Sequence, residues 1–217
     1  MKVTEPGIAE GFQRAATWLA TLMRARGWNS VCVASMVSGQ GATTTSVAIA
    51  HGLEELGLRT LLIEACPPSV NCGVADMFGL DKSRSLLSIA IEKHTPQECF
   101  QRTLGGVTVL PWGIEEDERE SGDIGVTLKQ TITAATEYDV VLVEAPPLKA
   151  PQAITILAAL RRVVLVVGAG STESTDLRML RRYMSRHEVE IVGAVFNKVR
   201  SPIPRLLDNA LFGSRVN

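Results

Sequence analysis

The sequence lacks long apolar runs, a strong charge of either sign and paired cysteines, and each absence excludes a class of protein. No stretch approaches the roughly 20 apolar residues that span a bilayer, and the opening MKVTEPGIAEGF holds no apolar run of signal-peptide length. The formal net charge of −1 gives no general field that would attract nucleic acid. The four cysteines (Cys32, Cys66, Cys72 and Cys99) show no C-x-x-C spacing, so we expect reduced thiols in a cytoplasmic protein without a leader.

The composition and the apolar pattern are typical of one α/β domain. The chain has 217 residues, of which 46% are hydrophobic, and this is enough to bury a sizeable core. Strand-sized apolar segments alternate with helical ones, which indicates crossover connections and a mostly parallel sheet. We expect a single domain over residues 1–217 that includes an N-terminal helix at about residues 8–26. Strands are predicted at 31–35, 60–64, 107–110, 139–144, 162–168 and 190–197, further helices at 43–56, 85–92, 126–136, 151–160 and 174–187, and a loop at 67–84.

A glycine-bearing loop follows the first predicted strand and precedes a predicted helix. It reads Ser38-Gly39-Gln40-Gly41-Ala42-Thr43-Thr44-Thr45. Glycines let such a loop turn its backbone N–H groups toward phosphate oxygens, and the helix N-terminus adds partial positive charge. A glycine turn that only starts a helix has the same residues, so the loop alone leaves both interpretations open.

Five segments, in order along the chain, resemble the motifs of one family. Ile8–Arg14 resembles an assembly helix that precedes the ATPase core, and Ser35–Ser46 resembles the phosphate loop G-x-G-K-T-T. Leu61–Pro68 resembles the Walker A′ strand L-L-V-D-A-D, and Tyr138–Pro147 resembles the Walker B strand Y-D-V-V-I-I-D-T-P-P. Val192–Val199 resembles G-V-V-L-N-R-V. The chain therefore resembles the bacterial tyrosine kinases (BY-kinases) of capsule and exopolysaccharide assembly, within the MinD/ParA group of deviant P-loop ATPases.

This resemblance implies a fold and a site. The fold would be the three-layer α/β/α P-loop NTPase fold with a mostly parallel sheet. In the family, the asparagine that corresponds to Asn197 faces the adenine, and the residues of the glycine-bearing loop face the phosphates. The implied phosphate and nucleotide residues are Gly39, Gln40, Gly41, Thr43, Thr44 and Asn197, and the implied Mg²⁺ site is Thr43, Glu64 and Glu144.

The departures from the family pattern occur at the positions that bind phosphate and Mg²⁺ in the family. Ala42 stands in place of the phosphate-binding lysine, Glu64 and Cys66 in place of two aspartates, and Glu144 in place of the Walker B aspartate. Phosphoryl transfer needs a positioned positive charge and carboxylates that hold Mg²⁺, an ion that prefers oxygen to sulfur. We therefore expect no catalytic residue, no metal and no tightly bound cofactor, while weak binding of ATP or Mg²⁺ stays open.

The resemblance also implies what the protein does. It would be a catalytically inactive relative in exopolysaccharide biosynthesis or export that acts through protein–protein association. Its partner would be the cytoplasmic part of an inner-membrane polysaccharide co-polymerase or export protein, contacted by Glu10 and Arg14, with self-association as a further expectation and no nucleic acid. The only tyrosines are Tyr138 and Tyr183, which excludes a phosphorylated C-terminal tyrosine cluster. The alternatives are an active or weakly ATP-binding kinase or ATPase and a MinD/ParA-like positioning factor.

Overall fold

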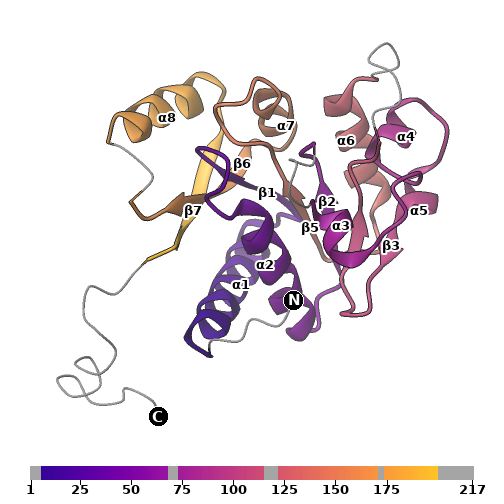
Figure 1. Ribbon diagram of the computed structural model, residues 1–217, viewed down its shortest axis with the longest axis horizontal. Coiled ribbons are helices and arrows are strands. Elements are labelled where there is room, and N and C mark those ends of the chain that lie inside the picture. The colour runs from indigo at the N-terminus through magenta and orange to yellow at the C-terminus, as the bar shows by residue number, and fades with distance from the viewer. Residues whose placement is uncertain (1–5, 68–72, 115–121, 171–173, 200–217) are drawn as a thin grey trace.

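The fold is a seven-stranded sheet between two layers of helices (Figure 1). The computed structural model describes residues 6–67, 73–114, 122–170 and 174–199. The strand order is β3-β4-β2-β5-β1-β6-β7, and every pair is parallel except β3 with β4. The strands are β1 (Ser30–Ser35), β2 (Thr60–Glu64), β3 (Gln101–Arg102), β4 (Thr108–Leu110), β5 (Val140–Glu144), β6 (Arg162–Gly168) and β7 (Glu190–Asn197).

Helices cover both faces of the sheet. The helices are α1 (Pro6–Arg26), α2 (Ala42–Glu55), α3 (Val74–Phe78), α4 (Leu86–Ala90), α5 (Pro96–Cys99), α6 (Ile124–Ala134), α7 (Ala153–Leu160) and α8 (Ser174–Arg186). Figure 1 shows α1 and α2 on one side of the strands and α6, α7 and α8 on the other. The expectation of a P-loop-type α/β fold with a mostly parallel sheet is confirmed.

The central strands are apolar along their whole length because both of their faces are buried. In β1, Cys32 packs into the core on the α7 side, whereas Val31 and Val33 pack into the core on the α2 side. Every residue of β1, β2 and β5 is buried. Such two-sided burial is typical of parallel sheets and explains continuous apolar runs in place of alternating ones.

The N-terminal helix packs on α2 through a face shifted from the predicted one. The expected face was Ile8, Phe12, Ala15, Leu19 and Leu22. Among the described side chains of α1 (residues 9–26), the fully buried ones are Ala16, Leu19 and Met23, whereas Phe12, Ala15 and Leu22 are partly buried. Ile8 lies outside the described side chains. The shift follows from a close helix–helix contact at Gly52 of α2, where an added Cβ would lie 2.7 Å from the Cβ of Ala16.

Three short elements were not predicted. The segment 67–84 was expected to be a loop, but it contains the five-residue helix α3, and α5 and the antiparallel strand β3 also went unrecognised. Elements this short carry little periodicity and depend on tertiary contacts. The prediction of a reduced thiol at Cys72 lies outside the described residues, as does the C-terminal tail beyond residue 199. Among the residues that the structure describes, no helix is both long enough and apolar enough to cross a bilayer.

Candidate functional site

The glycine loop connects β1 to α2, as the sequence predicts. Gly39 and Gly41 have φ angles of 79° and 93°, a left-handed conformation that glycine adopts without a Cβ clash. Gly41 precedes the first residue of α2, and its carbonyl accepts the N–H of Thr45 at 2.9 Å. A Cβ at Gly41 would lie 2.2 Å from Nδ2 of Asn197, so the loop approaches the end of β7 closely.

One cavity of about 680 Å³ lies at the carboxyl ends of β1, β2, β5 and β7. Its lining includes nine of the ten residues that the sequence singles out for the nucleotide site: Gly39, Gly41, Ala42, Thr43, Thr44, Glu64, Cys66, Glu144 and Asn197. The exception is Gln40, whose side chain is buried and accepts the N–H of Met36 at 3.1 Å. Gln40 therefore braces the loop from within.

Glu144, the last residue of β5, is buried and carries the most perturbed carboxyl of this cavity. Its side chain is only 4% exposed, and its Oε1 accepts a hydrogen bond from the hydroxyl of Thr43. Burial raises the pKa of Glu144 to about 7, with a smaller contribution from the charge of Glu64. Its Oε2 has no hydrogen-bond partner among the described residues.

Glu64 lies beside Glu144 in the register of β2 and β5, but its oxygens bind the protein backbone. Oε1 accepts the N–H of Val74 at 2.7 Å, and Oε2 accepts the N–H of Trp112 at 3.1 Å. Burial raises the pKa of Glu64, and the backbone hydrogen bonds oppose that shift. The side chain of Glu64 thus holds Val74, the first residue of α3, and Trp112, which follows β4, against the end of β2.

Cys66 follows β2 and contributes a neutral thiol to the cavity. Burial, together with the charges of Glu144 and Glu64, raises the pKa of Cys66 to about 12. Metals bind the thiolate form of cysteine, which is scarce at neutral pH when the pKa is this high.

The end of β7 contributes a residue that the sequence analysis missed. Asn197 donates from Nδ2 to the carbonyl of Gln40 at 2.9 Å, and its Oδ1 accepts the N–H of Lys198 at 2.9 Å. Lys198 has a positive φ of 58°, and its ammonium donates to the carbonyl of Gly39. Lys198 stands at the arginine position of the motif G-V-V-L-N-R-V that Val192–Val199 resembles, and this was the sequence signal for it.

These residues do not fit the Mg²⁺ and nucleotide that the family resemblance implies. Both oxygens of Glu64 already accept hydrogen bonds from backbone N–H groups. The hydroxyl of Thr43 donates a hydrogen bond to Glu144, and the side chain of Ala42 carries no ammonium group. In the described part of the chain, no group of three or more His, Cys, Asp or Glu side chains could hold a metal ion. The site thus combines a phosphate-type loop with two buried carboxyl groups, of Glu64 and Glu144, both of which are engaged in hydrogen bonds within the protein.

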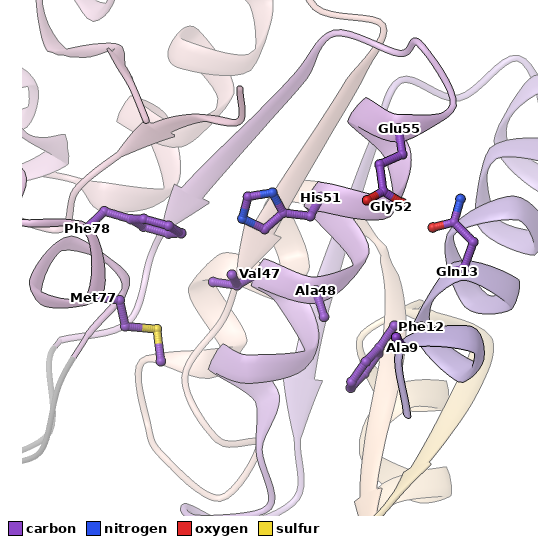
Figure 2. A pocket seen from close by; sticks show the side chains of 10 residues that line it. All are labelled: Ala9, Phe12, Gln13, Val47, Ala48, His51, Gly52, Glu55, Met77 and Phe78. Atoms are coloured by element: carbon purple, nitrogen blue, oxygen red, sulfur yellow. The ribbon is translucent and has the colours of Figure 1, made fainter. Parts of the chain in front are cut away.

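A second cavity, of about 560 Å³, lies between α1, α2 and α3. Figure 2 shows Phe12 of α1 on one side of α2, and Met77 and Phe78 of α3 on the other, with His51 directed toward Phe78. The His51 and Phe78 rings are 6.0 Å apart between centroids. Met77 also lines the first cavity, so α3 is shared by both cavities. The sequence analysis did not anticipate this cavity because α3 was not predicted.

The two predicted partner-binding residues lie on the outward face of α1. The side chains of Glu10 and Arg14 are exposed and border a shallow groove that also includes Trp18. Trp18 is 42% exposed, which is high for a residue of this size. None of these three residues lines the cavity at the loop between β1 and α2.

Comparison with known proteins relates the chain to tyrosine kinases and ATP-binding proteins. No protein-family model matches. The chain is 26% identical over 170 residues to an uncharacterised ATP-binding protein of Methanocaldococcus jannaschii, covering 78% of this chain and 64% of that protein. It is 27% identical over 199 residues to the putative tyrosine-protein kinase EpsB of Ralstonia nicotianae, covering 89% of this chain but only 26% of the kinase. It is 24% identical over 196 residues to the tyrosine-protein kinase CpsD of Streptococcus agalactiae, covering 85% and 82%.

Solved structures share the fold. The kinase domain of the Escherichia coli tyrosine kinase ETK superimposes with a TM-score of 0.72 at 19% identity, covering 88% of this chain and 77% of that one. The septum site-determining protein MinD of Pyrococcus horikoshii, complexed with Mg-ADP, gives a TM-score of 0.66 at 19% identity, covering 84% and 76%. The chain is thus similar in sequence to bacterial tyrosine-protein kinases, and it has the P-loop-type fold of the ETK kinase domain and of MinD.

Proposed function

We propose that this protein is a catalytically inactive BY-kinase relative that acts by protein–protein association in exopolysaccharide biosynthesis or export. The observation that carries the proposal is that the carboxylate of Glu64 is hydrogen-bonded to the protein backbone. Its two carboxylate oxygens accept the backbone N–H groups of Val74 and Trp112. A carboxylate that is needed to hold α3 in place cannot turn toward Mg²⁺ without leaving two buried donors unsatisfied.

Ala42 and Cys66, which stand in place of family residues, also argue against phosphoryl transfer. Ala42 offers neither charge nor donor, and Cys66 holds a protonated thiol where the family resemblance places an aspartate. Loss of one preorganised electrostatic group of this kind costs about 10²–10³ in rate. Two such losses would lower the rate of phosphoryl transfer by about 10⁴–10⁶ if they multiplied, although effects of groups that act together are not additive.

Association is supported by the outward face of α1. Glu10 and Arg14 can form charge-assisted contacts, and the half-exposed Trp18 beside them is the type of residue that dominates binding energy at interfaces. We infer that this face binds the cytoplasmic part of an inner-membrane co-polymerase or export protein, or a second copy of the chain. The protein would then be cytoplasmic and peripheral to the membrane through its partner.

The test combines calorimetry with turnover. The wild-type chain with Mg-ATP should show no binding in the low micromolar range and no phosphate release. A variant that restores the family residues (Ala42→Lys, Glu64→Asp, Cys66→Asp, Glu144→Asp) is the matched comparison for nucleotide binding. Micromolar Mg-ATP binding or turnover by the wild-type chain would favour the alternative of an active ATPase or kinase.

A MinD/ParA-like positioning role is tested separately. Lipid vesicles and duplex DNA should each fail to co-sediment with the chain in the presence and absence of ATP. ATP-dependent co-sedimentation with either one would favour the positioning role over partner association.

A further inference from the structure

The outermost strand, β7, exposes apolar side chains on the face of the sheet that α8 covers. In the described part of the chain, β6 is the only strand that pairs with β7 (Figure 1). Ile191 and Phe196 are in register with residues of β6 that pack into the core on the α8 side. Unlike those neighbours, Ile191 is 40% exposed and Phe196 is 69% exposed. Exposed apolar side chains on an edge strand are typical of a surface that binds another segment.

A groove of about 620 Å³ between α8 and β7 continues this surface. Its apolar lining residues are Leu165, Leu180, Met184, Val189 and Ile191. Ala194 and Phe196 follow Ile191 on the same face of β7, and both are exposed. The groove and these residues are called the β7 strip. The opposite face of β7 is already covered, because the ring of Trp18 lies so close to Gly193 that an added Cβ would be 2.2 Å from it.

The sequence that follows β7 has the pattern of an amphipathic helix. Residues 204–212 place four apolar residues on one side of a helix: Leu206, Leu207, Ala210 and Leu211. The other side carries polar residues, among them Asp208 and Asn209. Pro204 is a common first residue of a helix, and Gly213 is a common residue after the last one. These residues lie outside the described part of the chain, so the helix is predicted from their pattern alone.

The length and the starting point of this helix match the β7 strip. Val199 is the last described residue, and residues 200–203 connect it to the predicted helix. Such a connection has the usual length for a strand followed by a helix. Nine helical residues extend about 14 Å, and the extended chain from Ile191 to Phe196 spans about 17 Å. A helix that turns back after β7 can therefore cover most of the strip.

We propose that residues 204–212 form a helix that docks on the β7 strip of the same chain, with Leu207 and Leu211 against Phe196 and the groove. The short connection to β7 gives this segment a high effective concentration at the strip, which favours it over a separate molecule. Docking removes the apolar surface that an edge strand would otherwise offer to other chains. The contact is independent of the proposed function, because it uses neither the glycine loop nor the outward face of α1.

Hydrogen–deuterium exchange of the full chain tests the docking. A helix of nine residues is not stable by itself in water, so slow exchange of the amides 206–212 requires docking. We expect these amides to exchange about tenfold or more slowly than those of an unstructured peptide of the same sequence. Nuclear Overhauser contacts between the methyl groups of Leu207 or Leu211 and the ring of Phe196 should identify the strip. Unprotected amides or absence of these contacts would overturn the proposal.

Three variants make the result specific to the contact. Leu207→Asp places a charge on the apolar side of the helix and should increase exchange of the segment about tenfold or more. Asn209→Asp places the same charge on the polar side and should leave exchange unchanged. Phe196→Asp alters the strip and should release the segment as Leu207→Asp does, while slow exchange in β1 and β5 confirms that the domain is folded. Wild-type protection in both Leu207→Asp and Phe196→Asp would contradict the docking.

Dilution distinguishes docking within one chain from docking on a second copy. Protection of residues 206–212 that does not depend on protein concentration supports a contact within the chain. Protection that disappears on dilution would assign the strip to the segment of a second copy and would overturn the proposal.

Discussion

The hydroxyl of Thr43, in the first turn of α2, donates a hydrogen bond to the carboxylate of Glu144 at the end of β5. The two residues are 101 positions apart in the chain and come together because β1 and β5 are parallel neighbours. The family resemblance assigned both of them to Mg²⁺, whereas here the two side chains are hydrogen-bonded to each other. This contact joins the phosphate-type loop to the sheet and leads to the first prediction.

Replacement of Thr43 should affect stability more than function. Thr43→Ala leaves Oε1 of the buried Glu144 without its donor, and we expect a loss of about 1–3 kcal/mol in the free energy of unfolding. Thr43→Ser keeps the hydroxyl and should lose less than half of that amount. Urea denaturation of both variants measures the difference. If the two variants were equally stable, the hydrogen bond to Glu144 would contribute nothing to the fold.

The buried carboxyl of Glu144 should make the protein less stable as the pH rises. Its pKa is raised from 4.5 to about 7, so between these values the unfolded chain loses its proton before the folded chain does. The folded state therefore binds more protons in this window, and the free energy of unfolding falls with increasing pH. The full effect above pH 7 would be about 3 kcal/mol.

The comparison with Glu144→Gln isolates that effect. Carboxyls with lowered pKa values, such as those of Asp76 and Asp139, make the protein more stable as the pH rises, and they do so equally in the wild type and in the variant. The difference in unfolding free energy between variant and wild type should therefore grow in favour of the variant from pH 4.5 to about 7 and then level off. A difference that is constant with pH would show that Glu144 has an ordinary pKa.

The close approach of Gly41 to Asn197 should make Gly41 irreplaceable. A Cβ at Gly41 would lie 2.2 Å from Nδ2 of Asn197, whereas a Cβ at Gly57, which also has a positive φ, meets nothing within 4 Å. Both Gly→Ala changes incur the backbone strain of a left-handed alanine, about 1–2 kcal/mol. Gly41→Ala should be more destabilising than Gly57→Ala, as measured by thermal unfolding, and Asn197→Ala should relieve the excess in the double variant. Equal effects at the two glycines would contradict the contact.

The outward face of α1 should control association. Arg14→Glu reverses a charge beside Glu10 and Trp18 and should reduce polymer output in complementation of a deletion strain, at normal protein level. Arg24→Glu, also exposed on α1 but outside this groove, is the matched control and should retain output. Loss of output from Thr43→Ala at normal protein level, with Arg14→Glu fully active, would favour a nucleotide-dependent mechanism.

The sequence by itself determined the sheet and its loop. Continuous apolar runs such as Val140–Val143 predict buried parallel strands, because only a strand covered on both faces needs no polar residues. Gly39 and Gly41 between a strand and a helix predict the left-handed loop, because few other residues adopt that conformation. The prediction of parallel strands also places Glu64, Glu144 and Asn197 close together, because the carboxyl ends of parallel strands lie at the same edge of a sheet.

Tertiary structure alone decided what those side chains do. Nothing in the local sequence indicates that Glu64 accepts the N–H of Trp112, 48 residues away, or that Lys198 binds the carbonyl of Gly39. The helix α3 was missed because its five residues show little periodicity and because the N–H of its first residue, Val74, is satisfied by the side chain of Glu64 at the end of β2. Periodicity reports which face of an element is apolar, whereas the partner of a buried charge depends on which distant backbone groups the fold brings within about 3 Å of it.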